Sequence, residues 1–337
     1  MKETFGILPS GQEALLYTIR SSRLVAKISD FGATLTNLFV PDEKGNVADV
    51  VLAWEDCNAY IAKHGFLGST MGRNVNRIAG GRFVLNGKTV QIPQNNGENS
   101  LHSGPDFFGY RIWKVTDQQP DAITFALHSP DGDQGFPGNA DISVTYRLEG
   151  NTMRIIYDAI SDRDTVFNLT NHSYFNLAGH DKPERAVDQE LMMPGRFFTV
   201  TDDMGIPTGE NRSVEGTPLD FRTPKPIGRD VDADYEPMTL RKGYDHNFEV
   251  YCNPAAVLRD PHSGRTMEIS TDRPGIQIYF ANFPNGKYGK DGVYYPLHSG
   301  IAFETQFYPD SVNHPQWPQP FYKAGEHYHS ETSYTFK

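Results

Sequence analysis

The stretch DISVTYRLEGNTMRIIYDAI, residues 141–160, decides the fold class. Apolar residues recur at every second position from Ile142 to Leu148, and the positions between them are polar. This period of two is typical of a β-strand that buries one face. Turn-forming residues at 149–151 separate the first half from a second β-rich run. The stretch therefore predicts a β-hairpin.

Similar patterns recur outward along the chain. Two further hairpins are expected at 81–93, around Asn86-Gly87, and at 255–270. Other β-rich runs lie at 121–128, 275–283 and 299–307. The clearest helical pattern is short, at 55–63, so strands do not alternate with helices. Many strands of this kind predict an all-β, large antiparallel sandwich. The loop-rich segment 201–247 is expected to return to the same body, giving a single domain over 1–337.

The composition narrows the possible partners. The 337-residue chain has a formal net charge of −11 and no long basic run, which argues against nucleic acid and anionic membranes as partners. No apolar stretch approaches the roughly 18 residues that a membrane span needs. Cys57 and Cys252 are far apart and form no metal-binding or disulfide pattern. We expect a cytoplasmic protein, either a monomer or a weak homodimer.

His172 lies in NHSYFNLAGH, residues 171–180, among polar and aromatic neighbours. It could be a structural histidine at the end of a sheet, or a group that moves a proton. Asn168, Asn171 and Asn176 are close in sequence, and amides of this kind bind sugar hydroxyls while aromatic rings cover the apolar faces of sugars. These neighbours make a proton-transfer role as plausible as a structural one.

Glu304 lies inside the otherwise apolar run IAFETQF, residues 301–307, on the same strand face as Ala302 and Gln306. It could lie on an ordinary solvated face. It could also lie in a polar cleft, where partial desolvation would raise its pKa and make it a better base near neutral pH.

The remaining motifs are weaker when taken singly. GRNVNRIAGGRF, residues 72–83, lacks the spacing of a phosphate-binding loop, and its Arg and Asn residues suit hydroxyl recognition. His246 in GYDHNFEV is interpreted as structural. DGDQG at 131–135 lacks the later ligands of a calcium loop, and HYH at 327–329 has no third zinc ligand nearby. No metal site is predicted.

Together these motifs resemble a known family. GRNVNRIAGG, NSLHSG, DGDQGFPGN, NHSYFNLAG, GYDHNF and FETQFYPDSVNH occur in the order expected of aldose 1-epimerases, the galactose mutarotases. The resemblance implies a β-supersandwich that interconverts the α and β anomers of free aldoses such as galactose and glucose. It implies His172 as general acid and Glu304 as general base, starting as imidazolium and carboxylate. It also implies a set of substrate-binding residues: Asn76, Arg77, His102, Tyr174, Asp245 and Gln277.

This chemistry needs one acid and one base and no cofactor, and its only partner is a small aldose. Ser103 departs from the more usual glycine of the LHGG loop, and the residues after Gln277 depart from the usual pattern, which affects sugar preference.

A hexose-6-phosphate 1-epimerase would use the same fold and chemistry, but no additional Arg or Lys cluster is recognised near the motifs. A non-catalytic sugar-binding module would need neither His172 nor Glu304. A glycoside hydrolase usually needs two carboxylates, whereas the pair here is His and Glu.

Overall fold

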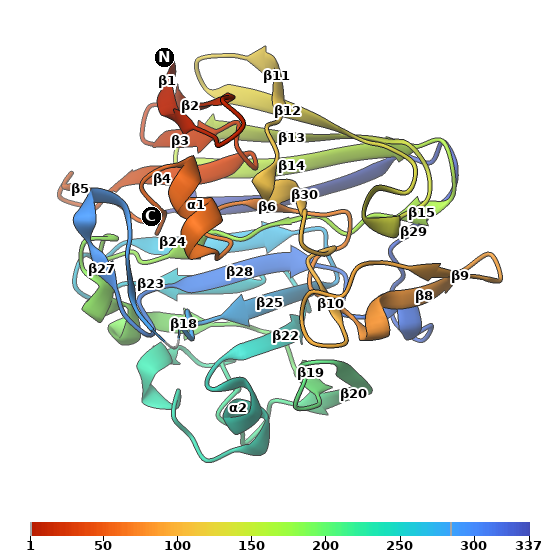
Figure 1. Cartoon of the computed structure of the whole chain (residues 1–337). Coiled ribbons are helices and arrows are strands. Elements are labelled where there is room, and N and C mark those ends of the chain that lie inside the picture. The colour runs from red at the N-terminus through yellow and green to blue at the C-terminus, as the bar shows by residue number, and fades with distance from the viewer. Residues whose placement is uncertain (1, 284) are drawn as a thin grey trace.

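The structure, a computed structural model that describes residues 2–283 and 285–337, has three large antiparallel sheets (Figure 1). The first has five strands, in the order β1 (Lys2–Ile7), β2 (Glu13–Arg20), β3 (Val25–Ser29), β4 (Thr34–Pro41) and β5 (Val47–Asp49). The second has nine, in the order β11 (Lys114–Gln118), β12 (Ala122–Ser129), β13 (Ala140–Glu149), β14 (Thr152–Ser161), β30 (Tyr328–Phe336), β24 (Thr266–Thr271), β23 (Ala256–Arg259), β18 (Glu190–Met192) and β21 (Lys225–Pro226). The third has six, in the order β17 (Tyr174–Phe175), β28 (Ile301–Gln306), β25 (Gly275–Tyr279), β22 (Asp245–Glu249), β19 (Phe197–Thr201) and β20 (Pro207–Ser213).

Short two-stranded pairs connect these sheets. They are β6 (Thr70–Met71) with β16 (Thr170–Asn171), β7 (Arg77–Ile78) with β10 (Ser100–Leu101), β8 (Arg82–Leu85) with β9 (Lys88–Gln91), β15 (Thr165–Val166) with β29 (Phe321–Tyr322), and β26 (Lys287–Tyr288) with β27 (Tyr294–Tyr295). Short 3₁₀ turns lie at Ala79–Gly81, Phe108–Tyr110, Asp133–Gly135, Pro183–Asp188, Ile227–Arg229, Lys290–Gly292 and Ser311–Asn313.

The predicted hairpin at 141–160 is confirmed as β13 and β14. Their register pairs Glu149 with Thr152 across the turn. The alternating residues of β13 that were expected to face inward are buried, and their neighbours are partly or fully exposed. The hairpins expected at 81–93 and 255–270 are confirmed as β8–β9 and β23–β24. Asn86 and Gly87 both have positive φ, 53° and 73°, as a type I′ turn requires.

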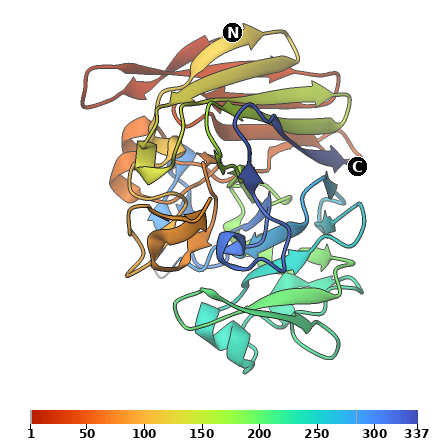
Figure 2. The ribbon, with the colours of Figure 1, turned by 90° about the vertical axis from the view of Figure 1, so that its right-hand side faces the viewer.

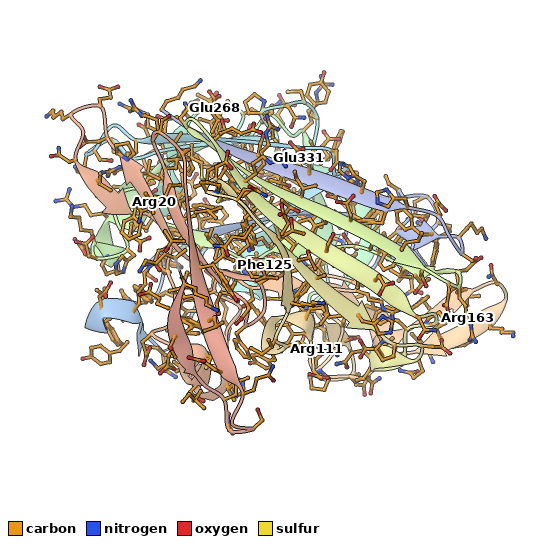
Figure 3. All side chains as sticks on the ribbon, turned by 90° about the horizontal axis from the view of Figure 1, so that it is seen from above. Arg20, Arg111, Phe125, Arg163, Glu268 and Glu331 are labelled. Carbon is orange, nitrogen blue, oxygen red and sulfur yellow. The ribbon has the colours of Figure 1, made fainter. Side chains whose placement is uncertain are left out.

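One hydrophobic core takes side chains from all three sheets, for example Ile19 of β2, Val144 of β13 and Ile278 of β25. Seen from above (Figure 3), the N-terminal strands run across the nine-stranded sheet, and Phe125 lies where they meet. Its ring packs edge-on against Tyr17 of β2 at 5.9 Å. Burial of these opposed apolar faces holds the layers together, and the predicted antiparallel sandwich is confirmed.

The six-stranded sheet extends this body at the far end from the N-terminal strands (Figure 2). The segment 201–247 contributes β20 to this sheet and β21 to the nine-stranded sheet, so it contacts both sheets. It also contains a short helix that was not predicted from the sequence, α2 (Glu236–Arg241). The expected helix at 55–63 is confirmed as α1 (Cys57–Lys63), which begins where the Asp56 side chain accepts a hydrogen bond from the Ala59 amide. Neither helix in the described ranges is long and apolar enough to cross a membrane.

Candidate active site

Three neighbouring strands of the six-stranded sheet form the floor of the site. In the antiparallel register, Gln277 of β25 lies opposite Glu304 of β28, and Tyr279 lies opposite both Asp245 of β22 and Ala302 of β28. Successive side chains of a strand point to opposite faces. The intervening residues of the same strands, including Ile278, therefore face the hydrophobic core, and the polar residues face the opposite side of the sheet.

His172 and Glu304 meet above this floor. His172 lies between β16 and β17, and its Nε2 is 3.5 Å from Glu304 Oε1. The side chains are only 5% and 3% exposed, which excludes the solvated strand face considered for Glu304. Within the described chain, neither His172 Nδ1 nor Glu304 Oε2 has a hydrogen-bond partner. Such unsatisfied buried groups are uncommon and point to a role outside folding.

Aromatic rings surround His172. Tyr174 stacks on it with a centroid separation of 5.0 Å and an interplanar angle of 21°. Phe66 lies 5.4 Å from the His172 ring and 4.6 Å from the ring of His102. This apolar packing fixes the orientation of the imidazole and excludes water from its faces.

Burial shifts the two proton-transfer groups toward their neutral forms. Desolvation lowers the pKa of His172 to about 4, opposed by its backbone environment and by the negative charge of Asp245. Desolvation, assisted by Asp245, raises the pKa of Glu304 to about 8, and the positive charge of Arg77 opposes this rise. The substrate-free site therefore favours a neutral acid and a neutral imidazole near pH 7. This differs from the carboxylate and imidazolium expected from the sequence, although both forms carry the same single proton.

A loop pair places Arg77 and His102 beside this centre. Strands β7 and β10 pair so that Leu101 lies opposite Arg77. The His102 amide donates to the carbonyl of Asn76 at 3.0 Å, and the Asn76 amide donates to His102 Nδ1 at 3.2 Å. Because Nδ1 accepts, a neutral His102 carries its proton on Nε2. Burial lowers the pKa of His102 well below its usual value, so this residue is a neutral hydrogen-bond donor.

Ser103, the departure from the more usual glycine, has a left-handed backbone with φ 73°. Its hydroxyl bonds both main-chain groups of Asn74, accepting from the amide at 2.8 Å and donating to the carbonyl at 2.9 Å. These two hydrogen bonds compensate for the unfavourable φ that a glycine would tolerate freely.

Asp245 and Gln277 form a unit at the side of the site. Gln277 Nε2 donates to Asp245 Oδ1 at 2.6 Å. Asp245 lines the pocket, whereas Gln277 does not. Gln277 orients the Asp245 carboxylate through this hydrogen bond, and the direct sugar contact that the resemblance implies for the glutamine stays a prediction.

The structure brings seven of the eight predicted site residues together around one pocket of about 340 Å³: Asn76, Arg77, His102, His172, Tyr174, Asp245 and Glu304. Further residues that line it were not predicted from the sequence, among them Phe66, Tyr279, Arg241 and Lys242. Arg241 and Lys242 directly precede the GYDHNF motif, so that position was an available signal. The expectation that no additional basic residues lie near the motifs is therefore wrong.

Several motif residues serve the fold instead. The three asparagines near His172 hydrogen-bond the backbone of neighbouring segments; Asn168, for example, accepts from the Phe307 amide at 2.9 Å, and Asn171 donates to the Gly68 carbonyl at 2.7 Å. None of them lines the pocket. His246, interpreted as structural, is buried and accepts from the Asp245 amide.

One group of side chains could hold a metal ion. His102, His172 and Glu304 each present a ligand atom, and these atoms lie within 4.8 Å of one another. Two histidines and a glutamate are a donor set that suits zinc. The prediction that the site works without a metal stays a prediction.

Comparisons with known proteins agree with this architecture. Residues 15–335 match the family described as Aldose 1-epimerase. The galactose mutarotase of Mus musculus is 39% identical over 99% of this chain and 98% of its own length, and the aldose 1-epimerase of Escherichia coli K12 is 37% identical over 100% and 99%. Among solved structures, the aldose epimerase homologue from C. elegans superposes with a TM-score of 0.88 at 32% identity, covering 96% of this chain and 98% of that one. The galactose 1-epimerase from Lactobacillus acidophilus gives 0.87 at 26% identity, covering 100% and 98%. This chain belongs to the aldose 1-epimerase family.

Proposed function

We propose that this protein is an aldose 1-epimerase that interconverts the α and β anomers of free aldohexoses, with His172 and Glu304 as its proton-transfer pair. The observation that carries the assignment of the pair is the 3.5 Å approach of His172 Nε2 to Glu304 Oε1 in the wall of the pocket. The activity itself is supported by full-length relatives named as galactose mutarotases and aldose 1-epimerases.

The reaction requires two proton transfers. A base takes the proton of the C1 hydroxyl while an acid gives a proton to the ring oxygen, and the ring opens to an aldehyde. Rotation about the C1–C2 bond presents the other carbonyl face, and the two transfers run backward as the ring closes. Glu304 acts as the base and His172 as the acid in ring opening, and the roles reverse in closure.

One proton shared by the pair is enough for this cycle. Burial favours its location on Glu304 in the free site, whereas Asp245 favours a charged His172 and Arg77 favours a charged Glu304. The charges of Asp245 and Arg77 oppose this preference without removing it, so the proton has to pass to His172 before Glu304 can act as the base of ring opening.

The remaining residues hold the sugar. The Nε2 proton of His102 stabilises negative charge that develops on oxygen as the ring opens. Asp245, oriented by Gln277, accepts from a hydroxyl remote from C1. Tyr174 covers an apolar face of the sugar beside the His172 ring.

We also propose that the chain works as a single domain over residues 1–337, as a monomer or weak homodimer in the cytoplasm, without a metal or other cofactor. The single-domain assignment is supported by the nine-stranded sheet, which combines β11–β14 with strands from the second half of the chain.

Polarimetry of freshly dissolved α-D-galactose tests the function and the pair. We expect the wild-type protein to accelerate the optical change well above the spontaneous rate, and Glu304→Gln and His172→Asn each to lose about 10²–10⁴-fold in kcat. Glu268→Gln and His329→Asn are matched controls on the nine-stranded sheet, outside the pocket, and should retain activity. A wild-type protein that binds galactose without accelerating its mutarotation would instead be a sugar-binding module.

A further inference from the structure

Three cations line the pocket without a carboxylate partner. Arg77, Arg241 and Lys242 all contribute to its wall. Within residues 2–283 and 285–337, none of the three has a nitrogen within 4.0 Å of a carboxylate oxygen. This contrasts with the rest of an acidic chain, in which many arginines and lysines form ion pairs, as Arg212 does with Glu210 and Lys337 with Glu268.

Two of these cations lie side by side. A side chain at Gly205 would begin 2.3 Å from Arg241 Nη1 and 3.0 Å from Arg77 Cζ. Both guanidinium groups therefore pack over the same glycine, and no side chain separates them there. Two like charges at such short range repel each other unless an anion neutralises them.

The remaining hydrogen bonds of Arg241 do not supply that anion. One guanidinium nitrogen donates to the backbone carbonyl of Asp203, and Nε is buried without a partner. Arg77 Nε donates to the side-chain amide oxygen of Asn96 at 3.2 Å. All these acceptors are neutral. Burial lowers the pKa of Arg241 and the charge of Arg77 adds to this change, whereas the more distant carboxylates of Asp245, Asp202 and Asp203 oppose it.

The acidic groups of the pocket do not balance the charge. Of the two acidic residues that line the pocket, Asp245 supplies one negative charge against three cations, and burial keeps Glu304 largely protonated near neutral pH. The wall therefore carries an excess of positive charge. Lys242 adds to it from the C-terminal end of α2, where it is exposed and has φ 58°.

We infer that the pocket accepts aldoses that carry an anionic group remote from C1, bound between Arg77 and Arg241 with Lys242 at the entrance. The inference rests on the proposed function, because the anomeric carbon of the same sugar must reach His172 and Glu304. A carboxylate, as in a hexuronic acid, and a phosphate, as in a hexose 6-phosphate, share this chemistry. Both are bound bidentately by guanidinium groups.

The test compares kcat/KM for galactose, galacturonate and galactose 6-phosphate, measured by NMR exchange between anomers after subtraction of the spontaneous rate. For the wild-type enzyme we expect at least one anionic sugar to exceed galactose in kcat/KM, mainly through a lower KM. Which of the two is preferred distinguishes the carboxylate from the phosphate. The advantage should decrease as salt is raised.

Arg241→Gln and Lys242→Gln identify the residues responsible. We expect the ratio of kcat/KM for the preferred anion to that for galactose to fall about tenfold or more in Arg241→Gln and less in Lys242→Gln, since Lys242 is exposed. Lys88→Gln, an exposed cation of β9 outside the pocket, is the control and should leave the ratio unchanged.

Two results would overturn the inference. One is a wild-type enzyme active on galactose but at least tenfold less efficient with both anions. The other is a ratio that Arg241→Gln does not change. A wild-type protein inactive on all three sugars would instead contradict the proposed function itself.

Discussion

Glu304 is a carboxyl group that is buried in the fold and must also exchange a proton during the proposed reaction. A solvent-exposed glutamate would be fully ionised at neutral pH. Its position inside a central strand removes water and makes it a weak acid near the pH at which it must work. The cost is a buried carboxyl group with one oxygen unpartnered.

The pH dependence of kcat/KM follows from the shared proton. Below about pH 4 His172 gains a proton as well and the pair has no base; above about pH 8 Glu304 loses its proton and the pair has no acid. We therefore expect a bell-shaped profile with limbs near these values. NMR titration of the His172 ring in the free enzyme should show it neutral at pH 6. An ionised His172 at that pH, or activity that does not fall above pH 8, would contradict the assignment.

Glu304→Gln should stabilise the fold at high pH. The carboxyl group has a pKa of about 8 when folded against an ordinary 4.5, so the folded state holds its proton more tightly. Proton binding by Glu304 therefore stabilises the folded state fully below pH 4.5, and this stabilisation is lost as the pH rises toward 8. Glu304→Gln has no proton to lose, so its free energy of unfolding should not fall in this way. The difference in unfolding free energy between the variant and wild type should grow to a few kcal/mol by pH 8, on the order of 1.4 kcal/mol per unit of pKa difference. Urea unfolding at pH 5 and 8 measures it. An advantage that is the same at both pH values would refute the pKa shift.

Secondary-structure elements were the most predictable level of this molecule. Alternation in β13 and the Asn86-Gly87 turn are local signals, because one strand or one turn determines them. The contact between Asp245 and Gln277 is not local. Both residues project from the same face of adjacent strands, and only the pairing of β22 with β25 brings their side chains within hydrogen-bond distance. For the same reason Asn168, Asn171 and Asn176 could be interpreted as sugar ligands, although they support loops.

The β10 loop offers a prediction at this scale. Ser103→Ala keeps the left-handed backbone but removes both hydrogen bonds to Asn74, leaving two buried main-chain groups unsatisfied, so we expect a loss of about 1–3 kcal/mol. Ser103→Gly loses the same bonds but is relieved of the strained φ, which should return about 1 kcal/mol. Urea unfolding of both variants compares them. Equal losses would mean that the backbone at residue 103 is unstrained.

At the scale of the whole molecule, buried cations join distant segments. Arg265, between β23 and β24, donates to the carbonyls of Val40, Leu177 and Asn46. Lys290, between β26 and β27, donates to the Thr36 carbonyl and to Asp49 Oδ2, both at 2.6 Å. These long-range contacts could not be predicted from the sequence, because the partners are far apart along the chain and meet only when the layers pack. Arg241 and Lys242 could have been suspected from their position before the GYDHNF motif, but the sequence does not show that Arg241 lies beside Arg77.

Lys290→Met tests the contribution of the buried contact between Lys290 and Asp49. It leaves the Asp49 carboxylate buried without its cation, which should destabilise the protein by about 3–5 kcal/mol. The double variant Asp49→Asn, Lys290→Met removes the uncompensated charge and should recover part of the loss. Thermal and urea unfolding measure both. If the double variant lost the full sum of the two single changes, the residues would not be acting as a pair.

The division of the pocket between a strand floor and a loop wall has a consequence for how such an enzyme can diversify. Glu304 belongs to a central strand, where a shift of one residue would turn it into the hydrophobic core, so any change there is tightly constrained. Arg241 and Lys242 belong to the end of a short helix, where insertion or exchange disturbs little else. An ancestral catalyst could therefore acquire a preference for new sugars by changes in one peripheral segment, while the machinery that opens the ring was inherited unchanged.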